Sequence, residues 1–137
     1  MIIKEAKNQK DFFMCMKVRG QVFVDEQHVK SEIEIDELDQ TCRHFIIIID
    51  DQPVAAMRAI EHDDYTKLGR ICVLKEYRHQ GIGEQLVHYV TQLIKGEFRL
   101  GAQLHALAFY EHLGFISYGD EFIEADIPHI MMKKEVE

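Results

Sequence analysis

The stretch "RHQGIG", residues 78–83, combines residue types that let a protein backbone bind an anion. Its two glycines allow an oxygen atom to approach the main chain closely, and an amphipathic run follows Gly83. The unpaired N–H groups and the dipole at the start of such a helix attract negative charge. We therefore expect a strand, a glycine loop and a helix that together bind a phosphate group.

Two common phosphate-binding loops do not match this stretch. A P-loop requires a lysine after its last glycine, whereas Glu84 follows Gly83. A dinucleotide fingerprint requires a third glycine, but Leu86 occupies that place and no strand–helix–strand unit leads into the loop. Taken alone, a turn of this kind more often does no more than start a helix, so a second motif is needed.

The segment "ALAFYEHLGF" at 106–115 supplies that second motif, with Phe-Tyr before Gly-Phe on a predicted short helix. The loop follows the pattern Gln/Arg-x-x-Gly-x-Gly/Ala, and together the two motifs resemble the paired signatures of the GNAT acetyltransferases in order and separation. Lys75 and His79 depart from the residues frequent in that family, and both side chains can point to solvent.

The resemblance extends over almost the whole chain. It includes three further segments: "VRGQVFVDEQ" at 18–27, "DELDQTCRH" at 36–44 and "FIEADIPHIMMKK" at 122–134. These resemble a branch of small bacterial GNAT proteins of the ElaA and YjcF type. The resemblance implies an α/β (α+β) acyl-CoA N-acyltransferase fold, a mixed sheet of about seven strands with about four helices, in which strands 4 and 5 splay apart to hold CoA.

Acetyl-CoA is the donor that this resemblance implies. Its pyrophosphate would bind the backbone of the loop, and the implied residues are His79, Gln80, Gly81, Ile82, Gly83 and Glu84. The side chain of Arg78 could add a charge-assisted contact or only lean on the surface, and we expect Arg78 to take part through its backbone. The pantetheine arm would pair like an added strand with Ile71, Cys72 and Val73, with Phe109 packing beside the cofactor.

Transfer of an acetyl group from a thioester to an amine requires an oxyanion donor and a proton for the leaving sulfur. A backbone N–H near Cys72 or Val73 could stabilise the oxyanion. Tyr110 resembles the family tyrosine that protonates the CoA sulfur, and a phenol with an ordinary pKa of about 10 keeps its proton at neutral pH. The alternative is that Tyr110 packs in the core with Leu107 and Leu113.

The general base is less clearly marked. By residue type the candidates are Glu32, Glu34, Glu37, His44 and Glu124, of which we assign Glu37 or His44. The run "DEQHVKSEIEIDELD" at 25–39 holds seven acidic residues in 15. We interpret most of this run as a solvated, irregular loop, with one or two members forming a rim that attracts a cationic amine. The side chains of Gln103, His105 and His129 are further candidates to line the cleft, as packing or polar lining.

The elements that position these residues follow from hydrophobic periodicity. Strands are predicted at 2–5, 43–49, 54–60, 67–74 and 97–103, with a terminal pair within 115–134. Helices are predicted from an Asn8 cap to about 22, from Gly83 to a stop near Gly96, and over 104–113. On the first helix we expect Phe12, Phe13, Met16 and Phe23 to lie on or near one face. We expect a single domain spanning 1–137.

Composition excludes several function classes. The chain carries 16 Lys+Arg against 24 Asp+Glu, a net charge of −8, and lacks a basic patch. We therefore expect no nucleic-acid partner and no binding to anionic membranes. The apolar run at 45–49 is too short to span a bilayer, and early charges argue against a signal peptide.

Cysteine and histidine usage points to a reducing compartment and to no metal site. Cys15, Cys42 and Cys72 are widely spaced with no CxxC pair, which predicts reduced thiols in the cytoplasm. The eight histidines are scattered and form no HExxH motif, so we expect no metal. Cys72 lacks a neighbouring base and is interpreted as a small strand residue rather than a nucleophile.

The leading hypothesis is an N-acetyltransferase that moves the acetyl group of acetyl-CoA to a primary amine of a small molecule or protein, by direct attack through a tetrahedral intermediate. One alternative is a non-catalytic module that binds or senses acetyl-CoA. Another is a plain nucleotide-binding domain, against which the missing lysine and third glycine argue. An exposed strand edge could support a homodimer.

Overall fold

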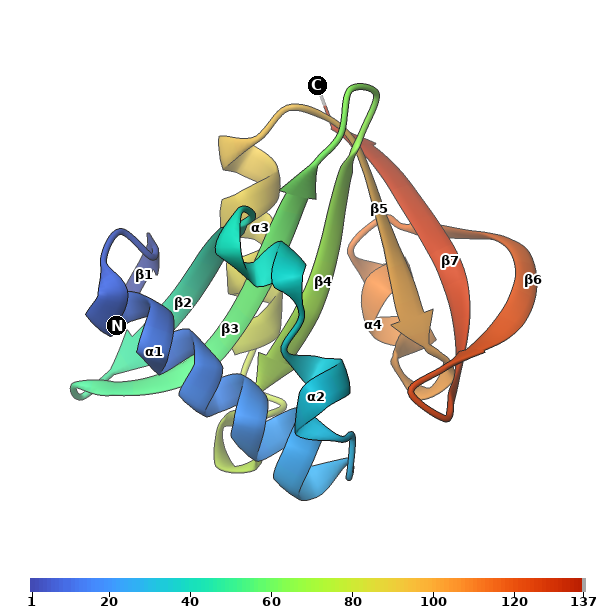
Figure 1. Ribbon diagram of the computed structural model, residues 1–137. Helices are drawn as coiled ribbons and strands as arrows, with labels where there is room; N and C mark the ends of the chain where they lie inside the picture. The colour runs from blue at the N-terminus through green and yellow to red at the C-terminus, as the bar shows by residue number, and fades with distance from the viewer. Residues whose placement is uncertain (137) are drawn as a thin grey trace.

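A seven-stranded mixed sheet forms the centre of the computed structural model, which describes residues 1–136 (Figure 1). Its strands are β1 (Ile2–Glu5), β2 (Arg43–Ile49), β3 (Gln52–Glu61), β4 (Thr66–Val73), β5 (Gly96–Gln103), β6 (Ile116–Glu124) and β7 (Ile127–Val136). They lie in the order β1-β2-β3-β4-β5-β7-β6, and only β4 and β5 run parallel. The predicted mixed sheet is confirmed.

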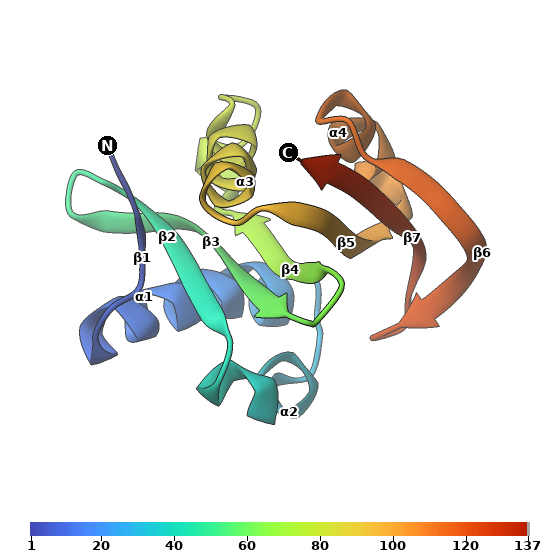
Figure 2. The same ribbon diagram turned by 90° about the horizontal axis from the view of Figure 1, so that it is seen from above.

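Helices cover both faces of the sheet. They are α1 (Gln9–Arg19), η1 (Gly20–Glu26), α2 (Ser31–Glu34), α3 (Ile82–Leu93) and α4 (Leu107–His112), with 3₁₀ turns η2 (Glu37–Gln40), η3 (Lys75–Tyr77) and η4 (Leu104–Ala106). Figure 2 shows α1 and α2 on one side of the sheet and α3 and α4 on the other. None of the helices within residues 1–136 has the length and apolar character needed to cross a membrane.

The first helix begins as predicted but ends differently. Asn8 caps α1 by accepting a hydrogen bond from the Asp11 N–H, which satisfies one of the free donors at the helix start. The predicted apolar face is wrong for Phe13, which is 58% exposed, whereas Met16 and Phe23 pack against the core. The buried face carries Asp11, Cys15, Val18 and Arg19 instead. Beyond Gly20 the chain continues as a seven-residue π-helix, η1, instead of ending near 22.

Strand β2 shows why the apolar run 45–49 is buried from Phe45 to Ile48 and half-buried at Ile49. Phe45 and Ile47 pack into the core under α3, whereas Ile46 and Ile48 pack into the core under α1. Side chains alternate between the faces of a strand, so a strand covered on both sides requires apolar residues at every position.

The sheet opens between β4 and β5. Their parallel ladder contains two pairs, Thr66 with Phe98 and Lys67 with Arg99. Beyond these pairs β4 continues alongside β3 as far as Val73, while β5 pairs with β7 along its whole length. Figure 1 shows the two strands diverging from the end where they meet. The predicted splay of strands 4 and 5 is thus confirmed, and it leaves a slot in the sheet.

A buried charge network fixes the acidic segment against the sheet. Arg19 is fully buried and donates to the Glu34 carboxylate at 2.9 and 3.1 Å and to the Asp39 carboxylate at 2.8 Å. Arg58 of β3 donates to Asp36 at 2.7 Å and to Asp39 at 2.9 Å. The interpretation of this run as a solvated loop is therefore wrong for Glu34 and Asp39, whose carboxylates are paired and buried.

Replacing Arg19 with methionine should destabilise the protein strongly. The change leaves the carboxylates of Glu34 and Asp39 buried with one cation fewer, and breaking a buried pair of this kind costs about 3–5 kcal/mol. Urea unfolding followed by circular dichroism measures the effect. The control is Arg43→Met, which removes a partly exposed arginine from its ion pair with Glu5. Equal losses in the two variants would contradict a special role for the buried network.

Stability should also fall in acid through Asp39. Burial raises the pKa of this carboxyl, but the hydrogen bond and charge of Arg19 outweigh burial and hold the pKa well below its usual range. In acid the unfolded chain therefore binds a proton at Asp39 that the folded chain does not. This contribution to stability begins to be lost as the pH falls below about 4 and shrinks further toward the lower pKa of the folded state. Urea unfolding of wild type and Asp39→Asn between pH 6 and pH 3 should give a shallower pH dependence for the variant. Parallel pH dependences would exclude Asp39 as a source of acid sensitivity.

Candidate functional site

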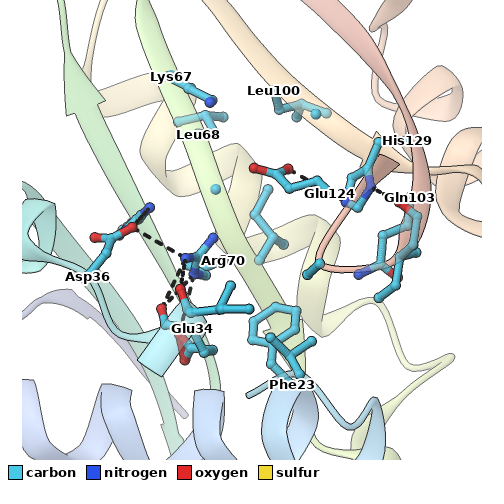
Figure 3. Close-up of a pocket in the computed structure, with 18 of the residues that line it drawn as sticks. Phe23, Glu34, Asp36, Lys67, Leu68, Arg70, Leu100, Gln103, Glu124 and His129 are labelled. Carbon is cyan, nitrogen blue, oxygen red and sulfur yellow. Dashed lines mark hydrogen bonds and ion pairs between the residues drawn. The ribbon is translucent and has the colours of Figure 1, made fainter. Parts of the chain in front are cut away.

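A cavity of about 270 Å³ lies where the sheet opens and extends from the α2 side of the sheet to α4. Phe23, Glu34 and Asp36 line it on one side, and Ile71, Leu100 and Tyr110 line its inner part. The β6–β7 hairpin completes its wall with Glu124 at the end of β6, Ala125 in the turn, and Ile127 and His129 of β7. Figure 3 shows this pocket, with the labelled side chains of several separate elements around one space.

The edge of β4 that faces the slot is open. The Leu74 N–H donates to the Val54 carbonyl oxygen, so the backbone of Leu74 faces β3. Backbone groups alternate in direction along a strand, and therefore Val73 and Ile71 turn their N–H and C=O groups toward the slot. Of the predicted strand residues, Ile71 and Val73 thus present backbone groups with which a chain of amides can pair, whereas the backbone of Cys72 faces β3. The Val73 carbonyl oxygen also accepts a hydrogen bond from Arg78 Nε.

The glycine loop has the geometry of an anion-binding turn. His79 and Gly81 have positive φ angles of 63° and 77°, and α3 begins at Ile82. Within the described chain, the backbone N–H groups from His79 to Glu84 donate to no other backbone or side-chain group. They are the free donors of a helix start preceded by a left-handed turn, an arrangement that attracts anions.

Gly83 joins the two sequence motifs in space. A Cβ atom at this position would lie 3.3 Å from the Phe109 ring and 3.4 Å from a Val73 methyl carbon. The start of α3, the end of β4 and α4 therefore meet at a place where only glycine fits without displacing a neighbour. Phe109 is 37% exposed and packs edge-on against Tyr110, with ring centroids 5.0 Å apart.

The side chain of Arg78 has two protein partners. Its Nε donates to the Val73 carbonyl oxygen at 2.9 Å, and its two Nη atoms donate to the Glu26 carboxylate at 2.6 Å each. The guanidinium therefore links the end of η1 to the end of β4. This contact was not predicted from the sequence, since the partners lie 52 residues apart.

Tyr110 lines the cavity from α4, in a largely apolar setting. Burial raises the pKa of its phenol, and a nearby Cys72 thiol contributes in the same direction. The hydroxyl group therefore stays protonated at neutral pH. No hydrogen bond to this hydroxyl is found within residues 1–136, and the residue lines the pocket, where the hydroxyl is available to an entering group.

Cys72 lies on the opposite face of β4 from the cavity, in the core under α1. Its thiol donates to the Ala56 carbonyl oxygen at 3.7 Å, and burial raises its pKa to about 12. A protonated, enclosed thiol is a poor nucleophile, which agrees with its interpretation as a strand residue.

The two assigned base candidates lie outside the pocket. Glu37 is exposed in the first turn of η2 and does not line the cavity. His44 is buried, its Nε2 lies 2.9 Å from the Asp39 carbonyl oxygen, and its ring packs edge-on against Phe12. Burial lowers the pKa of His44, so the ring is held neutral in the core. Neither residue therefore faces the cavity, and neither is carried into the proposed function.

Other sequence candidates do reach the pocket. Gln103, Glu124, His129 and Glu34 line it, whereas Glu32 and His105 do not. Two arginines that were not predicted from the sequence, Arg58 and Arg70, also line the cavity. An isolated arginine within an apolar strand, as in "VAAMRAI" at 54–60, is the signal that could have marked such a residue.

Arg70 lies at an irregularity of β4 and shapes the pocket wall. Its φ angle of 53° is left-handed, and the β3–β4 register shifts beside it. Its guanidinium donates to the Glu34 carbonyl oxygen at 3.0 and 3.1 Å and lies 3.4 Å from the Asp36 carboxylate. The bulge therefore turns a cation onto the acidic segment rather than into free space.

One group of potential metal ligands occurs away from the pocket. Asp39, Cys42 and His44 place ligand atoms within 4.8 Å of one another. The Asp39 carboxylate already accepts hydrogen bonds from Arg19 and Arg58, and these two positive charges oppose a metal ion.

Comparison with known proteins agrees with the geometry of this site. The family model described as an acetyltransferase (GNAT) domain matches residues 4–136. The chain is 38% identical to the uncharacterized N-acetyltransferase YjcF of Bacillus subtilis, over 95% of this chain and 96% of the relative. It is 36% identical to the uncharacterized protein YyaT of the same organism, over 99% and 97% of the two chains.

A solved structure shows the same fold. The crystal structure of Escherichia coli ElaA superposes with a TM-score of 0.89 at 28% identity and covers 98% of this chain and 100% of ElaA. The open ladder between β4 and β5, the glycine loop before α3 and the family match agree with one another. The chain therefore belongs to the GNAT family of acetyltransferases, whose members transfer an acyl group from acyl-CoA.

Proposed function

We propose that the protein transfers the acetyl group of acetyl-CoA to a primary amine, by direct attack of the amine on the thioester. The observation that carries this proposal is the cavity at the slot, where the open edge of β4 and the hydroxyl of Tyr110 meet the same space. The acceptor is a small molecule or a protein side chain, and a cavity of about 270 Å³ suits either of them.

The donor binds along the loop and β4. Its pyrophosphate takes the free N–H groups of residues 79–84, ahead of the dipole of α3. Its pantetheine amides pair with the backbone of Ile71 and Val73, which faces the slot. Phe109 packs beside this path, where Gly83 leaves room for its ring.

The N–H of Val73 or of a neighbouring β4 residue stabilises the oxyanion. As the amine attacks, the carbonyl oxygen gains negative charge, and a fixed donor in a sheltered site lowers the barrier most. The C–N bond then forms, the C–S bond breaks, and Tyr110 donates its proton to the departing sulfur. The raised pKa of Tyr110 keeps the phenol protonated at neutral pH, so a proton is present in the cavity when the C–S bond breaks.

We also propose a compartment, a domain organisation and an oligomeric surface for the protein. Its three cysteines are free thiols, two of them buried, which supports action in a reducing compartment such as the cytoplasm. Two apolar cores flank one continuous sheet, which supports a single domain spanning 1–137. The long edge strand β6 is a candidate surface for a homodimer.

The effect of Glu26→Ala on donor binding separates two roles of Arg78. If Arg78 acts by holding the Val73 carbonyl, loss of its partner Glu26 should loosen β4 and weaken acetyl-CoA binding by about three- to tenfold. If Arg78 is a phosphate ligand restrained by Glu26, the same change should free it and strengthen binding. Calorimetry at fixed ionic strength decides between the two signs.

Glu76→Ala is the matched control for that experiment. Glu76 is an exposed acid on η3, close to the same loop, and its carboxylate makes no described ion pair. Because this variant changes the net charge by the same amount, an equal effect on acetyl-CoA binding would show that long-range charge accounts for the result.

Tyr110→Phe should slow turnover without weakening donor binding. Phenylalanine keeps the ring packing but removes the proton donor, so kcat should fall by about a hundredfold while the KM for acetyl-CoA stays unchanged. Thiol release with a panel of primary amines measures both values. An equal change in kcat and KM would indicate a packing role. A wild type that binds acetyl-CoA and releases no thiol above background with any amine would identify a sensing module.

A further inference from the structure

Three acidic residues line the cavity together with three lysine or arginine residues, and most of these charged groups form ion pairs inside the protein. The charged residues that line it are Glu34, Asp36, Glu124, Arg58, Lys67 and Arg70. Which of these groups can meet a ligand depends on the partners each one has inside the protein.

The carboxylates of Glu34 and Asp36 are both paired with arginines. The Glu34 carboxylate is 3% exposed and is held by Arg19 and Arg70. The Asp36 carboxylate accepts from both Nη atoms of Arg58, at 2.7 and 3.0 Å. An incoming cation would have to displace an arginine from a buried pair, which is costly.

Glu124 is the exception among these acids. Within the described residues no lysine or arginine nitrogen lies within 4.0 Å of its carboxylate, and its side chain is 56% exposed. One carboxylate oxygen lies 3.9 Å from the position that a Cβ on Gly101 would occupy, so the group lies over β5 where glycine leaves space. Figure 3 shows Glu124 pointing into the pocket beside His129.

His129 is held in one orientation beside Glu124. Its Nδ1 lies 2.6 Å from the Ile127 carbonyl oxygen, and its ring stacks on Phe122 at 5.6 Å. Because a carbonyl oxygen only accepts, Nδ1 carries the hydrogen of the neutral ring and Nε2 carries the lone pair. The Nε2 atom lies 3.9 Å from the Glu124 carboxylate, too far for a hydrogen bond.

These two groups form a site for a donor with several N–H bonds. The Glu124 carboxylate and the Nε2 lone pair of His129 are both hydrogen-bond acceptors that face the same space. At 3.9 Å they form no hydrogen bond with each other. A primary ammonium group carries three N–H donors and a positive charge, so it can satisfy both at once.

We propose that Glu124 binds the ammonium group of the acceptor and that His129 Nε2 takes its proton before attack, an assignment that rests on the proposed function. The acceptor is thus a primary alkylamine that arrives charged. The ammonium N–H bond breaks, its electron pair stays on nitrogen, and the proton moves to Nε2 and then to solvent. The neutral amine attacks the thioester as described above, and its second proton restores the phenol of Tyr110 through solvent.

Two variants separate binding from proton transfer. Glu124→Gln keeps the shape but removes the charge, so the KM for the amine should rise by about ten- to a hundredfold with the KM for acetyl-CoA unchanged. Glu124→Asp, which keeps the charge, should recover part of the loss. His129→Gln should instead lower kcat by about a hundredfold. Glu121→Gln is the control, because Glu121 is an exposed acid of the same strand outside the cavity.

The probes are n-butylamine, L-lysine and 2-phenylethylamine, assayed by thiol release and by calorimetric binding in the presence of coenzyme A. If the wild type acetylates an amine and Glu124→Gln matches Glu121→Gln, this assignment is wrong while the proposed function stands. If the wild type acetylates none of the three amines, the proposed function fails. Calorimetric binding of the amines then tests the ammonium site separately. Amine binding lost in Glu124→Gln supports the ammonium site, and binding unchanged in that variant overturns it.

Discussion

The parallel ladder between β4 and β5 stops after two residue pairs, and the site depends on that interruption. A continuous ladder would use the backbone of Ile71 and Val73 within the sheet and would close the cavity. Because each strand is secured on its other side, β4 by β3 and β5 by β7, the sheet tolerates the opening. The opening leaves backbone N–H and C=O groups of β4 without partners in the sheet. Because such groups are costly to bury unpaired, a bound chain of amides that pairs with them is favoured.

The arginines beneath the acidic segment neutralise three of its carboxylates and hold it against the sheet. Three acids of residues 34–39 meet Arg19, Arg58 and Arg70, and the sum of these charges is zero. The three paired acids therefore form a wall of the pocket whose charge is neutralised by the arginines. This balance leaves Glu124, on the other wall, as the acid able to receive a cation.

The sequence was informative wherever one local pattern sufficed. Strand β2, the Asn8 cap and the glycine loop before α3 each follow from a few adjacent residues, and their predictions were confirmed. The paired motifs identified the family because their joint occurrence is specific, and Gly83 against Phe109 shows the physical contact that links them.

The features that the sequence did not predict depend on contacts between residues far apart in the chain. Arg19 meets Asp39 across 20 residues, and Arg78 meets Glu26 across 52, so no local pattern could show that these acids are paired. The same is true of the base candidates. His44 and Glu37 matched by residue type, but their position is set by packing on α1 and by the exposed turn η2.

A crystal structure of the protein with bound coenzyme A tests the central claim most directly. The account predicts pyrophosphate oxygens on the N–H groups of residues 79–84, pantetheine amides paired with Ile71 and Val73, and the sulfur within hydrogen-bonding distance of the Tyr110 hydroxyl. Coenzyme A bound outside the slot between β4 and β5, or with its sulfur directed away from Tyr110, would contradict the account.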